Sequence, residues 1–144
     1  MTEIITVRQT FVLFPLGKKR FAFSAEHVSE FARPDEPQTF PHTTPLLTGV
    51  VVRRNQIVPV ADVAPLLVGS DAPVRKFYLV VNRKLNGKVS RTAIPVTGEC
   101  ELTEAEQLPV TGKLPAYVSG LLSLKNEIVE VLDIEKLMSG EVRA

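Results

Sequence analysis

The chain has 144 residues, of which 17 are basic and 16 acidic, so its formal net charge is +1. This near balance leaves no bulk field that would draw the protein to nucleic acid or to an anionic lipid surface. Cys100 is the single cysteine, which excludes an internal disulfide and a thiolate metal cluster and fits a reducing compartment. We therefore expect one cytoplasmic domain that is large enough to fold around its own core.

In the N-terminal third, short apolar runs predict β-strands rather than helices. Residues 11–16 and 20–23 should form two strands joined by a turn at Gly17. Residues 33–45 contain four prolines and little hydrophobic periodicity, which is typical of an exposed, extended connection.

The middle of the chain predicts a β-hairpin. Residues 49–52 and 57–60 are apolar runs around "RRNQ", where Asn55 tolerates the left-handed conformation of a tight turn. Asp62 follows the hairpin and is placed to cap a short helical turn.

Further along, "KFYLVVNR" is the strongest predicted strand. It contains the longest strictly apolar run, residues 77–81, which is far short of the roughly 18 residues that suggest a membrane span. Thr103 and Glu106 stand at capping-box spacing and predict one helical turn.

An internal repeat is the most informative feature of the sequence. "LLTGVVVRRNQIVPVADVAPLLVG" aligns without a gap on "YVSGLLSLKNEIVEVLDIEKLMSG" at a constant offset of 71 residues, so that Asn55 falls on Asn126 and Asp62 on Asp133. The same offset places Arg20 on Arg91. We expect a mainly β fold, in which residues 1–144 form one domain of two repeated small barrels. The halves cover approximately residues 10–70 and 76–140, share a hydrophobic seam and leave a groove between them, and their terminal strands could cross over.

Three motifs that together span nearly the whole chain carry a family resemblance. They read "FVLFPLGKKRFAFSAEHVSEF", "GVVVRRNQIVPVADVAPLL" and "YVSGLLSLKNEIVEVLDIEKLM". With these motifs the chain resembles the CheW family, the adaptors of bacterial chemotaxis arrays. The resemblance implies two SH3-like five-stranded barrels, no catalysis and no cofactor. It also implies two partners, the regulatory domain of a CheA-type histidine kinase and the hairpin tip of a chemoreceptor.

The resemblance implies four partner-binding residues, of which Val28 and Gly49 match receptor-binding positions. Glu30 and Arg54 match an acid–base pair beside the groove that is associated with signalling. The match favours a partner contact for Arg54 but adds nothing to the case for Arg53, because adjacent strand residues point to opposite faces. Val52, Arg53 and Asn55 depart from the family's pattern, which leaves open a paralogue of a pilus or gliding system that modulates the kinase or competes for it.

Other chemistries find little support in the sequence. Asp62 and Asp133 read as helix caps in two copies of one unit rather than as a catalytic acid–base pair. His27 and His42 have no Cys, Asp or Glu cluster at metal-ligand spacing, so we expect neither a metal site nor an enzyme. A small nucleic-acid-binding barrel is the alternative from another class, which the balanced charge and the few aromatic residues disfavour.

Overall fold

The computed structural model describes residues 8–33, 46–69, 74–85, 87–110 and 112–139. Within these ranges the chain forms ten strands and three short helical segments. The elements are β1 (Arg8–Leu16), β2 (Lys19–Ser24), the 3₁₀ turn η1 (Ala25–His27), β3 (Val28–Ala32), β4 (Leu47–Arg53), β5 (Gln56–Ala61), α1 (Ala64–Val68), β6 (Phe77–Leu85), β7 (Lys88–Val96), β8 (Glu101–Glu106), β9 (Val118–Leu124), β10 (Glu127–Leu132) and α2 (Ile134–Ser139). The fold is mainly β, as the sequence predicts.

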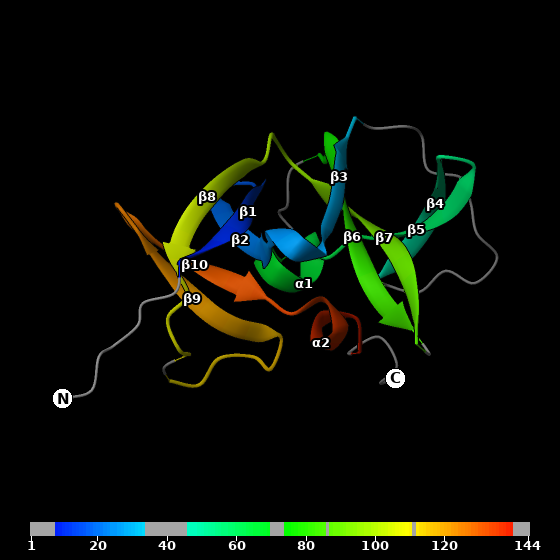
Figure 1. Cartoon of the computed structure of the whole chain (residues 1–144). Coiled ribbons are helices and arrows are strands. Elements are labelled where there is room, and N and C mark those ends of the chain that lie inside the picture. Colours follow the sequence, from blue (N-terminus) through cyan, green and yellow to red (C-terminus); the bar gives the residue numbers. More distant parts are fainter. Residues whose placement is uncertain (1–7, 34–45, 70–73, 86, 111, 140–144) are drawn as a thin grey trace.

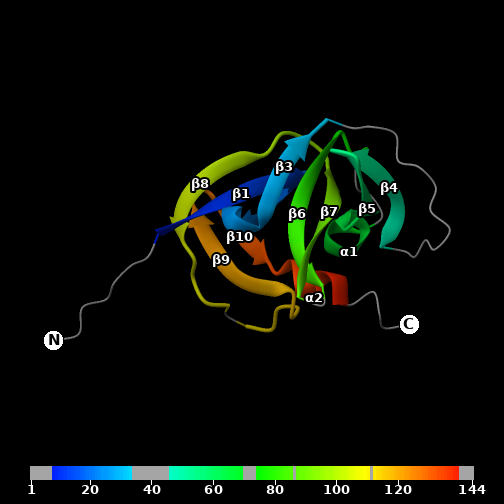
Figure 2. The same ribbon diagram turned by 45° about the vertical axis from the view of Figure 1, so that its right-hand side comes forward.

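The strands form two five-stranded sheets that lie side by side in both ribbon views (Figures 1 and 2). Sheet A has the order β8-β1-β2-β10-β9, and sheet B has the order β3-β6-β7-β5-β4. Each sheet therefore takes two strands from one copy of the repeat and three from the other. In each sheet, strands from the two copies meet in a parallel pairing, Val131 with Ala22 in sheet A and Val60 with Ala93 in sheet B. The residues of the two pairings are equivalent under the 71-residue offset. Residues 10–70 and 76–140 are halves of the sequence, whereas each sheet mixes the two.

The core explains why the strands read as nearly continuous apolar runs. Strand β1 is buried on both faces: Phe11 and Leu13 pack inside sheet A, while Phe14 and Leu16 belong to a second cluster between the sheets. Sheet B has its own interior around Tyr78 and Val80. The cluster between the sheets confirms the predicted seam, and it draws on both sheets and both α-helices through Phe14, Phe21, Phe23, Ala64, Leu79, Val81, Ile94, Leu137 and Met138.

The predicted hairpin is confirmed, and both residues of its turn have positive φ angles. Strands β4 and β5 pair in register up to Arg53 and Gln56, which leaves Arg54 and Asn55 as the two turn residues. Their φ angles are 52° and 61°, which is the left-handed pair that a type I′ turn requires. Among the described non-glycine residues, these two are the ones with positive φ, so the equivalent turn at Lys125 and Asn126 is of a different kind.

The helical turn predicted from Thr103 and Glu106 is wrong. Residues 101–106 form β8, which pairs antiparallel with the free edge of β1 from Arg8 to Leu13. Ala105 is buried against the interior of sheet A. The tertiary pairing outweighs the local capping pattern, because as a strand this segment hydrogen-bonds along β1 and also buries Ala105.

The two equivalent aspartates behave differently. Asp133 caps α2 as predicted, since its Oδ1 accepts hydrogen bonds from the backbone N–H groups of Glu135 at 2.9 Å and Lys136 at 3.1 Å. Asp62 does not cap α1, and the prediction there is wrong. The residue equivalent to Lys136 is Pro65, which has no N–H to donate.

Asp62 has a side-chain partner in place of a backbone one. Its carboxylate accepts from Arg75, at 3.1 Å from Nε and 2.7 Å from Nη2. The carboxylate therefore ties the end of β5 to the segment that leads into β6.

Two expectations lie outside the described residues: the extended connection at 33–45, apart from Arg33 itself, and His42. In the ranges that the structure covers, no helix is long and apolar enough to cross a membrane.

Candidate partner-binding site

Glu30 lies near the start of β3, at the outer edge of sheet B. It pairs with Val80 of β6, and an irregularity in the register separates it from Val28. Its side chain is only 14% exposed although it carries a charge. A carboxylate this far from water requires cationic or hydrogen-bonding partners.

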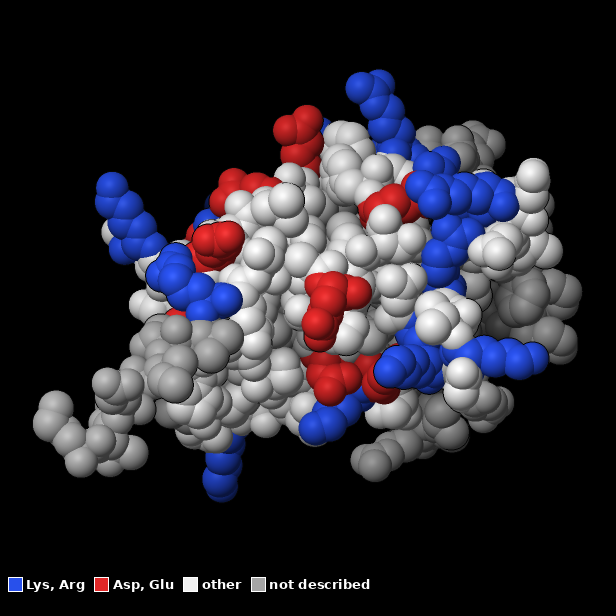
Figure 3. All heavy atoms as spheres, viewed as in Figure 1, with Lys and Arg blue, Asp and Glu red and all other residues white. Residues whose placement is uncertain are grey.

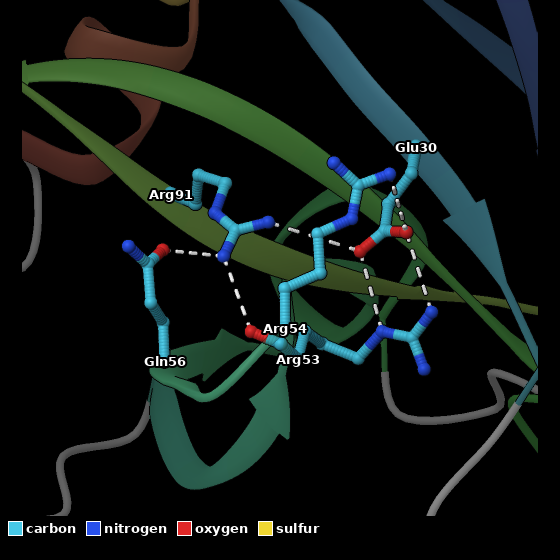
Figure 4. A network of polar contacts seen from close by, with 5 residues as sticks. All are labelled: Glu30, Arg53, Arg54, Gln56 and Arg91. Carbon is cyan, nitrogen blue, oxygen red and sulfur yellow. Dashed lines mark hydrogen bonds and ion pairs between the residues drawn. The ribbon is translucent and has the colours of Figure 1, made fainter.

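The partners of Glu30 come from the β4–β5 hairpin and from β7 (Figure 4). Arg53 makes the closest contact, donating from Nε to Oε1 at 3.2 Å and from Nη2 to Oε2 at 3.3 Å. Arg54 Nη2 lies 3.9 Å from Oε2, and Arg91 Nη1 lies 3.9 Å from Oε1. Three guanidinium groups thus surround one carboxylate.

The argument that Arg53 and Arg54 point to opposite faces is wrong at this site, because both side chains contact Glu30. Alternation of side chains applies within a strand, and β4 ends at Arg53. Arg54 already belongs to the turn and has a positive φ, and its side chain reaches the same carboxylate as that of Arg53. The acid–base pair of Glu30 and Arg54 does come together, but Arg53 is the residue that forms the hydrogen bonds.

Arg91 of β7 hydrogen-bonds to both strands of the hairpin. Its Nη2 donates to the backbone oxygen of Arg53 at 3.2 Å and to Oε1 of Gln56. Its side chain is as buried as that of Glu30. Arg91 therefore links the end of β4 and the start of β5 to β7. These are the two strand ends that flank the turn with Arg54.

The electrostatics of the cluster favour the charged carboxylate. The hydrogen bonds from Arg53 hold the pKa of Glu30 below its ordinary value, and the charges of Arg53, Arg54 and Arg91 act in the same direction. Burial opposes them by raising the pKa, but its effect is smaller than that of the Arg53 hydrogen bonds.

Val28 and Gly49 lie on the same sheet but not in this polar cluster. Val28 begins β3, is half-buried, and packs against the core between the sheets. Gly49 is buried in β4, opposite Val60 of β5, next to an irregularity in the strand register. Of the four residues that the sequence singled out, the structure brings Glu30 and Arg54 into contact.

Sequence reasoning missed Arg53 and Arg91, although the repeat contained a signal for Arg91. The 71-residue offset pairs Arg91 with Arg20, Gln56 with Glu127 and Glu30 with Glu101. In sheet A, Arg20 contacts both of these glutamates, at 2.9 Å from Nε to Glu127 and 3.0 Å from Nη1 to Glu101. The same polar framework is therefore built twice, once in each sheet.

No group of three His, Cys, Asp or Glu side chains is arranged to hold a metal ion in the part of the chain that the structure describes. Cys100 is partly buried, and burial raises the pKa of its thiol to about 12, so it is not a reactive thiolate at neutral pH. The Glu30 cluster suits recognition through charge and shape.

Comparison with known proteins assigns this arrangement to a class. The family model for the CheW-like domain matches residues 10–142, and the chain belongs to that family. Its members are non-catalytic scaffolding or adaptor proteins of chemotaxis signalling.

One curated relative and one solved structure agree with this assignment. The chemotaxis protein CheW of Klebsiella aerogenes is 24% identical, across 96% of this chain and 87% of the relative. The crystal structure of the scaffolding protein TtCheW from Thermoanaerobacter tengcongensis superposes with a TM-score of 0.77 at 15% identity, covering 96% of this chain and 92% of that one. The two five-stranded sheets are thus the two SH3-like subdomains of the CheW fold.

Proposed function

We propose that this protein is a cytoplasmic adaptor that couples chemoreceptors to a CheA-type histidine kinase. In this proposal the receptor hairpin tip binds in the groove between the two sheets, with Val28, Glu30, Gly49 and Arg54 as its contacts on sheet B, and the regulatory domain of the kinase binds a second face. The observation that carries the proposal is the Glu30–Arg54 contact of 3.9 Å, made at the family's motif positions within a chain that matches the CheW-like domain over residues 10–142.

The architecture suits such a coupling role. The two sheets share one apolar cluster, so a partner bound to sheet B is mechanically joined to a partner bound to sheet A. Coupling between two bound proteins requires that each favours the same arrangement of the protein between them. A close-packed core transmits a small displacement better than a flexible linker does.

Direct binding tests this proposal. The purified chain is titrated by calorimetry with the kinase regulatory domain and with a receptor cytoplasmic fragment, both from the organism that encodes the chain. We expect binding to each, and we expect Arg54→Asn to weaken receptor binding. Lys125→Asn is the matched control, because Lys125 is the equivalent residue in the other sheet. Absence of binding to either partner would refute the adaptor role.

A further inference from the structure

The two copies of the polar framework differ in how their arginines are neutralised. In sheet A, Arg20 has two carboxylate partners, Glu127 and Glu101. In sheet B, the residue equivalent to Glu127 is Gln56, so Arg91 donates to a neutral amide oxygen. Its remaining carboxylate, Glu30, is 3.9 Å away rather than the 3.0 Å that separates Arg20 from Glu101.

Glu30 is also shared. Both of its oxygens already accept hydrogen bonds from Arg53, so Arg54 and Arg91 contact it only at ion-pair distance. The side chain of Arg54 is 72% exposed at the tip of the hairpin. An exposed guanidinium on a type I′ turn whose flanking residues are hydrogen-bonded to Arg91 is well placed to receive a second carboxylate in bidentate geometry.

An open groove lies beside this framework, between the start of β5 and the β6–β7 hairpin. Its walls include Gln56, Ile57, Lys88, Val89 and Arg91, and no carboxylate is among the described residues that line it. Ile57 and Val89 are each 71% exposed, which is high for large apolar residues. Figure 3 shows a band of lysine and arginine side chains over this part of the molecule, on the right-hand side.

We propose that the groove and the hairpin tip beside it bind an acidic segment of a partner protein. Carboxylates of that segment contact Arg54, Lys88 and Arg91, and an apolar side chain of the segment lies against Ile57 and Val89. The inference rests on the proposed function, since the partner is a protein that the adaptor holds, and it specifies the chemistry of the contact. A protein segment fits better than nucleic acid, because no aromatic ring lines the described part of the groove for base stacking.

A synthetic peptide tests the inference without any receptor or kinase. The ¹⁵N-labelled full chain is titrated with the blocked peptide (Glu-Leu-Glu-Gly)₃, and amide shifts are followed by NMR. We expect shifts at Arg54, Ile57 and Val89 and none at the equivalent Lys125 and Ile128. The affinity should fall several-fold between about 50 and 300 mM NaCl, because exposed charge pairs are screened.

Two variants and one control test whether binding depends on the incomplete neutralisation of Arg91 in sheet B. Gln56→Glu gives Arg91 the carboxylate that Arg20 has, and we expect about three- to fivefold weaker binding. Arg54→Asn removes the exposed cation and suits the left-handed turn, so it keeps the test valid if Gln56→Glu perturbs folding. Glu127→Gln makes the opposite exchange in sheet A and should leave peptide binding at the groove unchanged.

Several results would overturn the inference. These are no shifts at about 1 mM peptide, equal shifts in sheet A, equal binding of the matched peptide (Lys-Leu-Lys-Gly)₃, or wild-type affinity in both groove variants. Tighter binding of a single-stranded oligonucleotide or of phosphatidylserine vesicles at the same amides would also overturn the inference, because the groove would then bind nucleic acid or lipid rather than an acidic protein segment. Failure of the peptide alongside intact binding of receptor and kinase rejects only this inference and leaves the adaptor role standing.

Discussion

Arg53 and Glu30 form a two-point ion pair across the end of sheet B, with Nε to Oε1 at 3.2 Å and Nη2 to Oε2 at 3.3 Å. Arg54 lies outside this pair, 3.9 Å from the carboxylate, and its side chain is 72% exposed. Arg53 therefore holds the carboxylate in place, and the proposed partner contact falls to the exposed guanidinium of Arg54.

The ion pair predicts a pH-dependent contribution to stability. Glu30 has a folded-state pKa below its ordinary value of 4.5, so its contribution is fully present above pH 4.5 and is lost as the pH falls through the lowered folded-state pKa. We expect Glu30→Gln to lower the free energy of unfolding at pH 7 and to lose this effect progressively in acid, below pH 4.5. Urea denaturation across this range measures it. A cost of Glu30→Gln that stays constant with pH would show that the carboxylate contributes nothing through its charge.

The sequence predicts more of the architecture than of the site. The 71-residue offset identifies which strands are equivalent, such as those of Arg20 and Arg91, and so it predicts two similar sheets. The offset does not predict which strands pair with each other. Val60 could have paired with a strand of its own copy of the repeat, but it pairs with Ala93 of the other copy.

Local rules failed where a single residue changed the context. Pro65 removes one of the two N–H groups that Asp62 would have capped, and the turn at Arg54 ends the strand alternation on which the expectation for Arg53 rested. The proline can be read from the sequence, whereas the residue at which a strand gives way to a turn is known from sequence only to within a residue or two.

The unequal aspartates predict two different kinds of loss. Asp133→Ala removes the cap of α2 and should cost about 1 kcal/mol of unfolding free energy. Asp62→Ala breaks the contact with Arg75, so the loss of unfolding free energy that it causes should largely vanish when Arg75 is already alanine. The losses caused by Asp133→Ala and Arg75→Ala should instead be additive. A double-mutant cycle in urea measures both. Equal coupling of the two aspartates to Arg75 would be inconsistent with their separate roles.

The seam between the sheets predicts that one aromatic residue stabilises both subdomains. Phe14 is fully buried, with ring centroids 5.1 Å from Phe23 and 6.0 Å from Phe21. Phe14→Ala should cost about 3–5 kcal/mol while leaving a single cooperative transition. Leu102→Ala, on the exposed face of β8, is the control and should cost less than about 1 kcal/mol. Two separate transitions in the Phe14 variant would mean that the sheets fold independently.

The β4–β5 turn predicts a difference between two equivalent asparagines. Asn55 has a φ of 61°, which β-branched residues rarely adopt, so Asn55→Val should cost about 1–2 kcal/mol. Asn126 is not in that conformation, and Asn126→Val should cost about 0.5 kcal/mol or less. Asn55→Gly should be tolerated, because glycine adopts positive φ without strain. Thermal unfolding compares the three variants, and equal losses for the two valine substitutions would contradict the assigned turn.

The most direct test of the adaptor role asks whether this protein joins a kinase to receptor-bearing membranes. Membranes containing the receptor are mixed with the CheA-type kinase of the same organism and sedimented, with and without the chain, and autophosphorylation is measured in the pellet. We predict that the kinase sediments and responds to receptor ligand only when the chain is present, that Arg54→Asn impairs both effects, and that Lys125→Asn impairs neither. Kinase that sediments equally well without the chain, or that the chain displaces from the membranes, would contradict the coupling role.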